Sequence, residues 1–190
     1  MGILGNEKYI IVRFVSWNAT HDRGHSGMSY KNKLLAVEKL SKEAKVFISS
    51  ENELPPELEK YRFPLSPEKM HDAIAFASLM YGESATMATE GAVLGVPGIY
   101  LDNTSRLYTK EIEKKYGLII NYTESESDQL ASIEKAIQIL KNSSSIWEEG
   151  RRKLLGEKIN VTAFLIWLIE NYPESKSILR RNPEYQLKFS

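Results

Sequence analysis

Short apolar runs alternate with longer amphipathic stretches along most of this chain. The runs are rich in β-branched and aromatic residues, as is typical of buried parallel strands, and lie at 9–15, 45–50, 78–81, 98–101 and 118–121. Helix start signals or helical spacing of apolar residues predict helices between them, at about 29–43, 66–77, 84–95 and 107–116. Further helices are predicted at 128–141, 146–155 and 161–172. This alternation predicts an α/β fold, a Rossmann-like three-layer sandwich with a parallel sheet of about five to six strands.

We expect one domain over residues 1–190, because a chain of this length is long enough to bury a single core. Residues 9–142 would form its Rossmann-like core and residues 143–190 a C-terminal helical extension. Within the extension, Val161–Ile169 is apolar nearly all round. That pattern is typical of a helix that is buried on several sides or that covers a partner.

Two polar loops fall at the same edge of the predicted sheet. Right-handed crossovers place the carboxyl ends of parallel strands along one edge, and ligands of such sheets bind there. The loop 16–28 follows the first predicted strand, and the segment 82–86 follows the third. Together the two loops favour a ligand site at this edge.

The segment 82–86 leads into a predicted helix, with Ser84 and Thr86 at its start. A helix N-terminus presents unpaired N–H groups and a partial positive charge, which suit a phosphate. Glu90 lies one turn further on, on roughly the same face as Thr86, where a carboxylate can accept hydrogen bonds from a ribose diol. The pattern indicates a nucleotide or nucleotide-sugar site. The alternative is an ordinary helix between two strands, with Ser84 or Thr86 as its N-cap.

The loop 16–28 holds two of the three histidines, with charged residues beside them. One interpretation is a zinc or manganese site made by His21, Asp22 and His25. A second is anion binding by Arg23 or His21 together with loop amides. A third is a loop whose polar side chains satisfy its own backbone. His21 and Asp22 would also make an acid–base pair.

Composition narrows the classes of function. The chain has 25 basic and 25 acidic residues and no net charge, which argues against bulk nucleic-acid binding. It has no cysteine, so disulfides, thiolate catalysis and Cys-ligated metals are excluded. No run reaches the roughly 18 apolar residues of a membrane span, and the first residues lack the apolar core of a signal peptide. We therefore expect a cytoplasmic protein with neither a membrane span nor a nucleic-acid partner.

Four segments of the chain together resemble a known family. They are Ile10–Gly27, Phe47–Glu51, His71–Ala77 and Thr86–Pro97. They resemble domain-of-unknown-function family 354, which is similar to the superfamily of GT-B glycosyltransferases and UDP-N-acetylglucosamine 2-epimerase. The resemblance covers about residues 9–172.

The resemblance implies a substrate. In the superfamily the C-terminal Rossmann-like half binds the nucleotide, so residues 9–142 would be a nucleotide-binding core. The natural ligand is then a nucleoside diphosphate sugar, most simply a UDP-sugar, as substrate and without a further cofactor. Ser84, Ala85 and Thr86 match the phosphate loop, and Glu90 matches the glutamate that holds the ribose.

The resemblance also implies roles for the first loop. His21, Asp22 and Arg23 occupy the place of the epimerase His-Arg motif beside the phosphates. His21 and Asp22 would then be catalytic, and Arg23 would contact the phosphates. The chain departs from the superfamily where Ala85 and Thr86 replace a glycine pair, and at Glu83, an acid that would repel a phosphate if it faced inward.

GT-B enzymes place the active site between two Rossmann-like domains, and this sequence has residues for one of them. The resemblance therefore implies a missing N-terminal half, in cis or in trans, and an isolated chain that is catalytically incomplete. The implied chemistry is glycosyl transfer or sugar-nucleotide epimerisation in surface polysaccharide synthesis. Val161–Ile169 would lie near the missing half, so we expect exposed apolar surface there and a homo-oligomer, a dimer, that covers it.

Two other classes of function stay open. One is a non-catalytic interaction module that has kept the fold and lost the site. The other is a metal-dependent hydrolase that uses His21, Asp22 and His25.

Overall fold

The computed structural model describes residues 1–190 except for 4, 6, 19–23, 104–105 and 143–145. The described chain divides into two compact units, Met1–Arg151 and Arg152–Ser190. That the whole chain forms one domain stays a prediction.

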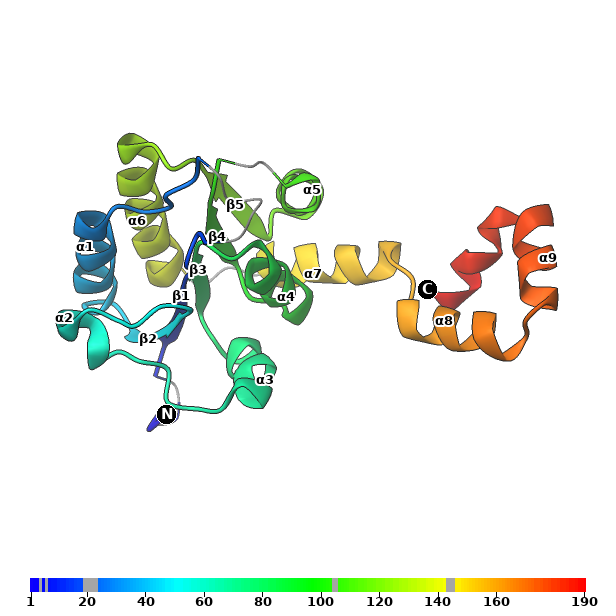
Figure 1. The fold of residues 1–190 in the computed structure, drawn as a ribbon, viewed down its shortest axis with the longest axis horizontal. Helices are drawn as coiled ribbons and strands as arrows, with labels where there is room; N and C mark the ends of the chain where they lie inside the picture. The colour runs from blue at the N-terminus through cyan, green and yellow to red at the C-terminus, as the bar shows by residue number, and fades with distance from the viewer. Residues whose placement is uncertain (4, 6, 19–23, 104–105, 143–145) are drawn as a thin grey trace. The chain divides into compact units, whose positions relative to one another are not determined.

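The first unit is built around a sheet of five parallel strands in the order β2-β1-β3-β4-β5 (Figure 1). The strands are β1 (Tyr9–Phe14), β2 (Lys45–Ser50), β3 (Leu79–Gly82), β4 (Gly98–Leu101) and β5 (Ile119–Tyr122). Each neighbouring pair is parallel. The predicted α/β, Rossmann-like fold is therefore confirmed.

Helices cover both faces of this sheet. They are α1 (Tyr30–Leu40), α2 (Pro56–Glu59), α3 (Met70–Ala75), α4 (Ala85–Leu94), α5 (Leu107–Tyr116) and α6 (Glu126–Lys141), followed by α7 (Ile146–Glu157). In Figure 1, α1 and α6 lie on one side of the sheet, and α3, α4 and α5 lie on the other. None of the described helices is long and apolar enough to cross a membrane.

The central strand β1 contributes to the core on both faces. Ile10 and Val12 pack with the residues of α1 and α6, whereas Tyr9 and Ile11 pack with those of α3 and α4. All four side chains are buried. A strand buried on both faces has a continuous apolar run, which is the pattern that predicted it.

The topology brings the two predicted loops together. The chain runs from β1 outward to β2 and then returns to β3 on the other side of β1, so the switch point of the sheet lies between β1 and β3. The Glu83 N–H donates to the Arg13 carbonyl oxygen at 2.9 Å. Gly82 has a φ of 136°, and a Cβ there would lie 2.1 Å from that same oxygen. The loops after β1 and β3 are therefore neighbours, as the sequence predicted.

Capping side chains explain where several helices begin. Ser29 Oγ accepts the Asn32 N–H at 3.2 Å, and Ser84 Oγ accepts the Met87 N–H at 3.3 Å. The single helix predicted at 66–77 is wrong in part: a 3₁₀ turn, η2 (Pro67–Lys69), precedes α3. Its predicted cap, Ser66, donates to the Glu68 carboxylate and makes no side-chain capping bond.

The second unit holds α8 (Val161–Glu170), α9 (Glu174–Arg181) and a 3₁₀ helix, η3 (Pro183–Phe189). One side of α8 packs on η3: the ring centroids of Phe164 and Phe189 are 5.6 Å apart, and those of Trp167 and Tyr185 are 4.8 Å apart.

The other side of α8 is open. All residues of α8 are described, and none of them is buried. Its exposed apolar residues are Val161, Leu165, Ile166 and Ile169. η3 and α9 contact α8 without burying any of its residues, so of the two expectations a helix buried on several sides is wrong, and a helix that covers a partner stays a prediction. The exposed apolar surface that the resemblance implied is present.

Candidate functional site

A pocket of about 350 Å³ opens at the carboxyl edge of the sheet, beside the switch point. Its walls come from the ends of four strands. After β1 the lining includes Ser16 and Trp17, after β2 Glu51, after β3 the segment 83–86, and after β4 Asp102 and Arg106. This is the edge at which the sequence predicted a ligand site.

The N-terminus of α4 forms one wall of the pocket. Ser84, Ala85 and Thr86 all line it, so the structure brings these three predicted residues together. Ser84 is also the N-cap of α4. The Ser84 hydroxyl therefore caps the helix, as the alternative of an ordinary helix predicted, and Ser84 also lines the pocket.

Glu90 lies outside this pocket. It is four residues beyond Thr86, which is about 6 Å along the helix axis. Its carboxylate Oε1 lies 3.3 Å from Nε2 of His71, and both residues line a separate, apolar hollow. A ribose role for Glu90 stays a prediction, and it requires a ligand that extends along α4.

A second pocket, of about 450 Å³, also borders the first turn of α4. Met87 of that turn lines it, together with Arg13, Phe63 and Met70. Sequence reasoning missed this pocket, because its walls come from four separate parts of the chain.

Glu83 is buried, with 3% of its surface exposed. Its carboxylate accepts the N–H groups of Val15 at 2.9 Å and of Met28 at 2.7 Å, and Lys33 Nζ lies at 3.2 Å. Burial raises the pKa of the Glu83 carboxyl, while Lys33 and the two N–H groups act in the opposite direction. The carboxylate that would repel a phosphate if it faced inward is thus bound by Val15, just before the loop 16–28, and by Met28 at its end.

Of that loop, the structure describes 16–18 and 24–28. His21, Asp22 and Arg23 lie outside the described residues, so their predicted roles stay predictions. The described ends are held by carboxylates from other strands: Glu51 accepts the Ser16 N–H at 3.0 Å, and Glu124 accepts the Ser26 N–H at 3.0 Å. In these described parts, then, acceptors from elsewhere in the fold satisfy the loop backbone.

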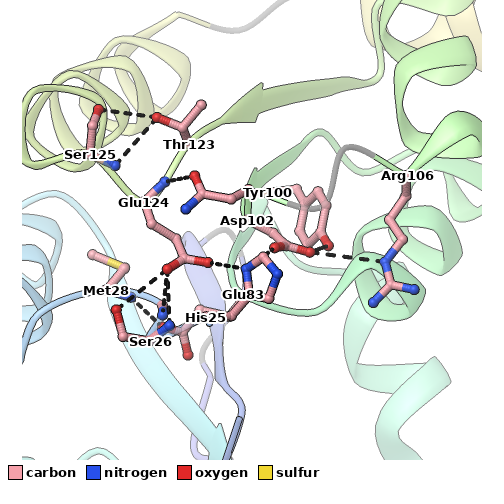
Figure 2. A network of polar contacts seen from close by, with 12 residues as sticks. His25, Ser26, Met28, Glu83, Tyr100, Asp102, Arg106, Thr123, Glu124 and Ser125 are labelled. Atoms are coloured by element: carbon pink, nitrogen blue, oxygen red, sulfur yellow. Dashed lines mark hydrogen bonds and ion pairs between the residues drawn. The ribbon is translucent and has the colours of Figure 1, made fainter. Parts of the chain in front are cut away.

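His25 meets two acids that sequence reasoning did not connect with it (Figure 2). Its Nδ1 lies 2.9 Å from Oε1 of Glu124 and 3.5 Å from Oδ1 of Asp102. Its ring stacks on Trp17, which lines the pocket, with centroids 6.0 Å apart. Asp102 directly follows β4 and Glu124 is the second residue after β5, so their position after two apolar runs was a signal for the same edge of the sheet.

Comparison with known proteins finds similarity of structure. No family model and no curated protein matches this sequence. The structure is similar to that of a protein from Listeria monocytogenes assigned as a UDP-N-acetylglucosamine 2-epimerase, with a TM-score of 0.54 and 16% identity over 77% of this chain and 40% of that one.

Two further structures are similar at lower scores. One is a UDP-N-acetylglucosamine 2-epimerase, at a TM-score of 0.45 and 18% identity over 80% of this chain and 43% of that one. The other is MnaA of S. aureus in complex with UDP, at a TM-score of 0.47 and 14% identity over 84% of this chain and 45% of that one.

What these likenesses share is the fold. The chain has a Rossmann-like α/β architecture, and this architecture is what it has in common with the Listeria monocytogenes protein. It spans less than half the length of each of the three.

Proposed function

We propose that this chain is the nucleotide-sugar-binding half of a GT-B-like glycosyltransferase or sugar-nucleotide epimerase, with a UDP-sugar as substrate. The observation that carries the proposal is the 350 Å³ pocket at the switch point, bordered by the N-terminus of α4. Switch-point pockets bind ligands in open α/β sheets, and a helix N-terminus binds phosphate groups.

The diphosphate lies against the first turn of α4. The N–H groups of Ala85 and Thr86 and the hydroxyl of Ser84 donate to its oxygens, and the guanidinium of Arg106, which also lines the pocket, supplies positive charge. Arg23 adds a second cation from the loop. A nucleoside diphosphate is long enough to continue along α4, so that the ribose hydroxyls bind Glu90, about 6 Å further on.

The base enters the second pocket beside Met87. That pocket offers an aromatic ring, Phe63, and the guanidinium of Arg13. With the nucleotide held in this way, the sugar lies beside the loop 16–28, where His21 and Asp22 act as acid and base. The N-terminus of α4 and the arginines stabilise the negative charge of the departing nucleoside diphosphate. Glycosyl transfer and sugar-nucleotide epimerisation both need this electrostatic stabilisation.

The same proposal includes the missing half of the enzyme. The other wall of the cleft, and with it the acceptor or the remaining catalytic groups, comes from a second Rossmann-like domain in cis or in trans. We place the activity in surface polysaccharide synthesis, as the resemblance to the superfamily implies.

Calorimetry with UDP tests the nucleotide site. We expect the full chain to bind UDP, and Glu90→Gln to bind it about tenfold more weakly, because a neutral amide loses the charge-assisted hydrogen bonds to the ribose. Glu134→Gln is the matched control, since Glu134 is exposed on α6 and pairs with Lys39. All titrations are run in EDTA. Absence of heat with UDP and with other nucleoside diphosphates, with the second half present, would reject the proposal.

The open side of α8 favours a second candidate function, a non-catalytic interaction module. Ile166 and Ile169 are 51% and 73% exposed, which is unusual for side chains of this kind. A chain that dimerises through α8 and ignores every nucleotide would support this candidate over the first.

A further inference from the structure

Three potential metal ligands converge from three parts of the sheet edge (Figure 2). His25 comes from the loop after β1, Asp102 from the end of β4 and Glu124 from the end of β5. One ligand atom from each lies within 4.8 Å of the others. The rigid carboxyl ends of parallel strands carry both acids, and the Asp102 side chain is 1% exposed.

Each acid uses one oxygen to hold the fold and turns the other toward His25. Glu124 Oε2 accepts the N–H groups of Ser26 and Gly27 at 3.0 and 3.1 Å, while Oε1 lies 2.9 Å from the imidazole Nδ1. Asp102 Oδ2 accepts the Tyr100 hydroxyl and lies 3.9 Å from Arg106 Nε, while Oδ1 lies 3.5 Å from the same Nδ1. The outer bonds orient the two carboxylates, as the outer shell of a metal site does.

The spacing of the inner atoms fits a small divalent cation. Ligand atoms about 2.1 Å from a tetrahedral zinc lie about 3.4 Å from one another. The distances from Nδ1 to the two carboxylate oxygens, 2.9 and 3.5 Å, lie close to that value. The His25 imidazole N–H can donate a hydrogen bond to only one of the two carboxylate oxygens. A cation bound among Nδ1 and these two oxygens would contact all three atoms.

The charge of the cluster also suits a cation. Burial raises the pKa of the Glu124 carboxyl, but hydrogen bonds from the Ser26 and Gly27 amides and from His25 outweigh this and leave the pKa below its ordinary value. Glu124 Oε1 lies 2.9 Å from His25 Nδ1, and an imidazole coordinates a metal in its neutral form.

We propose that His25 Nδ1, Asp102 Oδ1 and Glu124 Oε1 bind one divalent transition-metal cation of the zinc or manganese class. One imidazole and two carboxylates are the donor set that these ions take. Three protein ligands leave coordination positions for water or for an anionic ligand. Asp102 lines the pocket as well, so the cation lies at the wall where a phosphate or sugar oxygen reaches it.

This ligand set differs from the set suggested by the sequence, which joined His25 to its loop neighbours His21 and Asp22. The proposal needs no nucleotide, so its success or failure is independent of the nucleotide site. We therefore test it without UDP, whereas the UDP titrations are run in EDTA.

Calorimetry and elemental analysis on the full chain test the site. After dialysis against EDTA and then into chelator-free buffer, the chain is titrated with ZnCl₂ and separately with MnCl₂. We expect one equivalent of at least one of these ions to bind. Asp102→Asn and Glu124→Gln should each weaken binding at least tenfold, while their amide oxygens still accept the outer hydrogen bonds.

His71→Gln is the matched control, because it removes an exposed imidazole that pairs with Glu90 on α4. It should leave the affinity unchanged. The Co²⁺-loaded chain provides a second readout, since its visible absorption bands should shift in His25→Gln and stay in His71→Gln.

Two outcomes overturn the proposal. One is a wild-type chain that takes up neither ion. The other is binding that survives Asp102→Asn and Glu124→Gln but is lost in His21→Gln or Asp22→Asn, which would favour the set of loop neighbours. Melting curves of each variant without metal distinguish a lost ligand from a lost fold.

Discussion

At the scale of single residues, Glu83 shows how an acid is accommodated beside a proposed phosphate site. Its carboxylate is bonded to Val15 and Met28, at the two ends of the loop 16–28, and to Lys33 of α1. A buried charge is tolerated when it is paired and hydrogen-bonded in this way. Glu83 thus connects the start of α4 to the loop that carries the predicted catalytic residues.

Replacing Glu83 by alanine should lower the free energy of unfolding by about 3 kcal/mol, because the Lys33 charge and two inward N–H groups lose their acceptor. Urea unfolding followed by circular dichroism measures this change. Glu51→Ala is the control: Glu51 also binds a loop N–H, that of Ser16, but it is exposed and should cost less than about 1 kcal/mol. Equal losses in the two variants would contradict the role given to Glu83.

His25 was predicted as a candidate ligand from the sequence, but its partners in the structure were not. Its residue type and loop marked it as a candidate ligand, which stays a prediction, and the sequence grouped it with residues of the same loop. In the structure its partners are Asp102 and Glu124. The path of the loop decides this, because the Ser26 and Gly27 amides bind the same Glu124 carboxylate. Such contacts between distant parts of the chain leave no local pattern.

At the scale of elements, α4 carries the candidate nucleotide site. The sequence predicted its start, its end at Gly95 and the strands on either side, because capping and αL glycine are local signals. The two interpretations of Ser84, cap and phosphate ligand, are compatible. A hydroxyl that accepts the Met87 N–H keeps its own proton to donate to a phosphate.

The substitutions Ser84→Ala and Ser29→Ala separate these two roles. Both remove an N-cap, so each should lower the free energy of unfolding by about 1 kcal/mol. Only Ser84→Ala should also weaken UDP binding, because Ser29 begins α1 and does not line the pocket. Thermal melts and calorimetry measure the two effects. A Ser84→Ala chain with unchanged UDP affinity would restrict Ser84 to its role as a cap.

At the scale of the whole molecule, the described chain holds one Rossmann-like unit and a small helical unit. The chain resembles the Listeria monocytogenes structure in fold and covers 40% of that protein's length. The small helical unit leaves one side of α8 uncovered. Together these observations support the proposal that a partner surface completes the molecule.

We expect a homodimer that uses α8, with a mass about twice the 21.7 kDa of the chain, in light scattering coupled to size exclusion. Ile166→Asp should convert it to a monomer, because a charge cannot be buried in an apolar interface without a partner. Phe76→Asp is the control, since Phe76 is 80% exposed after α3, in the other unit. A wild-type monomer, or loss of the dimer in Phe76→Asp, would contradict this use of α8.

The sequence alone determined the strands, most helix boundaries, the parallel sheet and the edge of the sheet at which the pocket opens. These follow from signals within a few residues: apolar runs, caps, glycine ends and the right-handed crossover. Only the tertiary structure decided that Glu83 holds both ends of the loop, that Glu90 lies outside the main pocket, and that His25 meets Asp102 and Glu124. Those outcomes depend on strand order and on loop paths across the sheet, where residues distant in the chain compete for the same hydrogen bonds and charges.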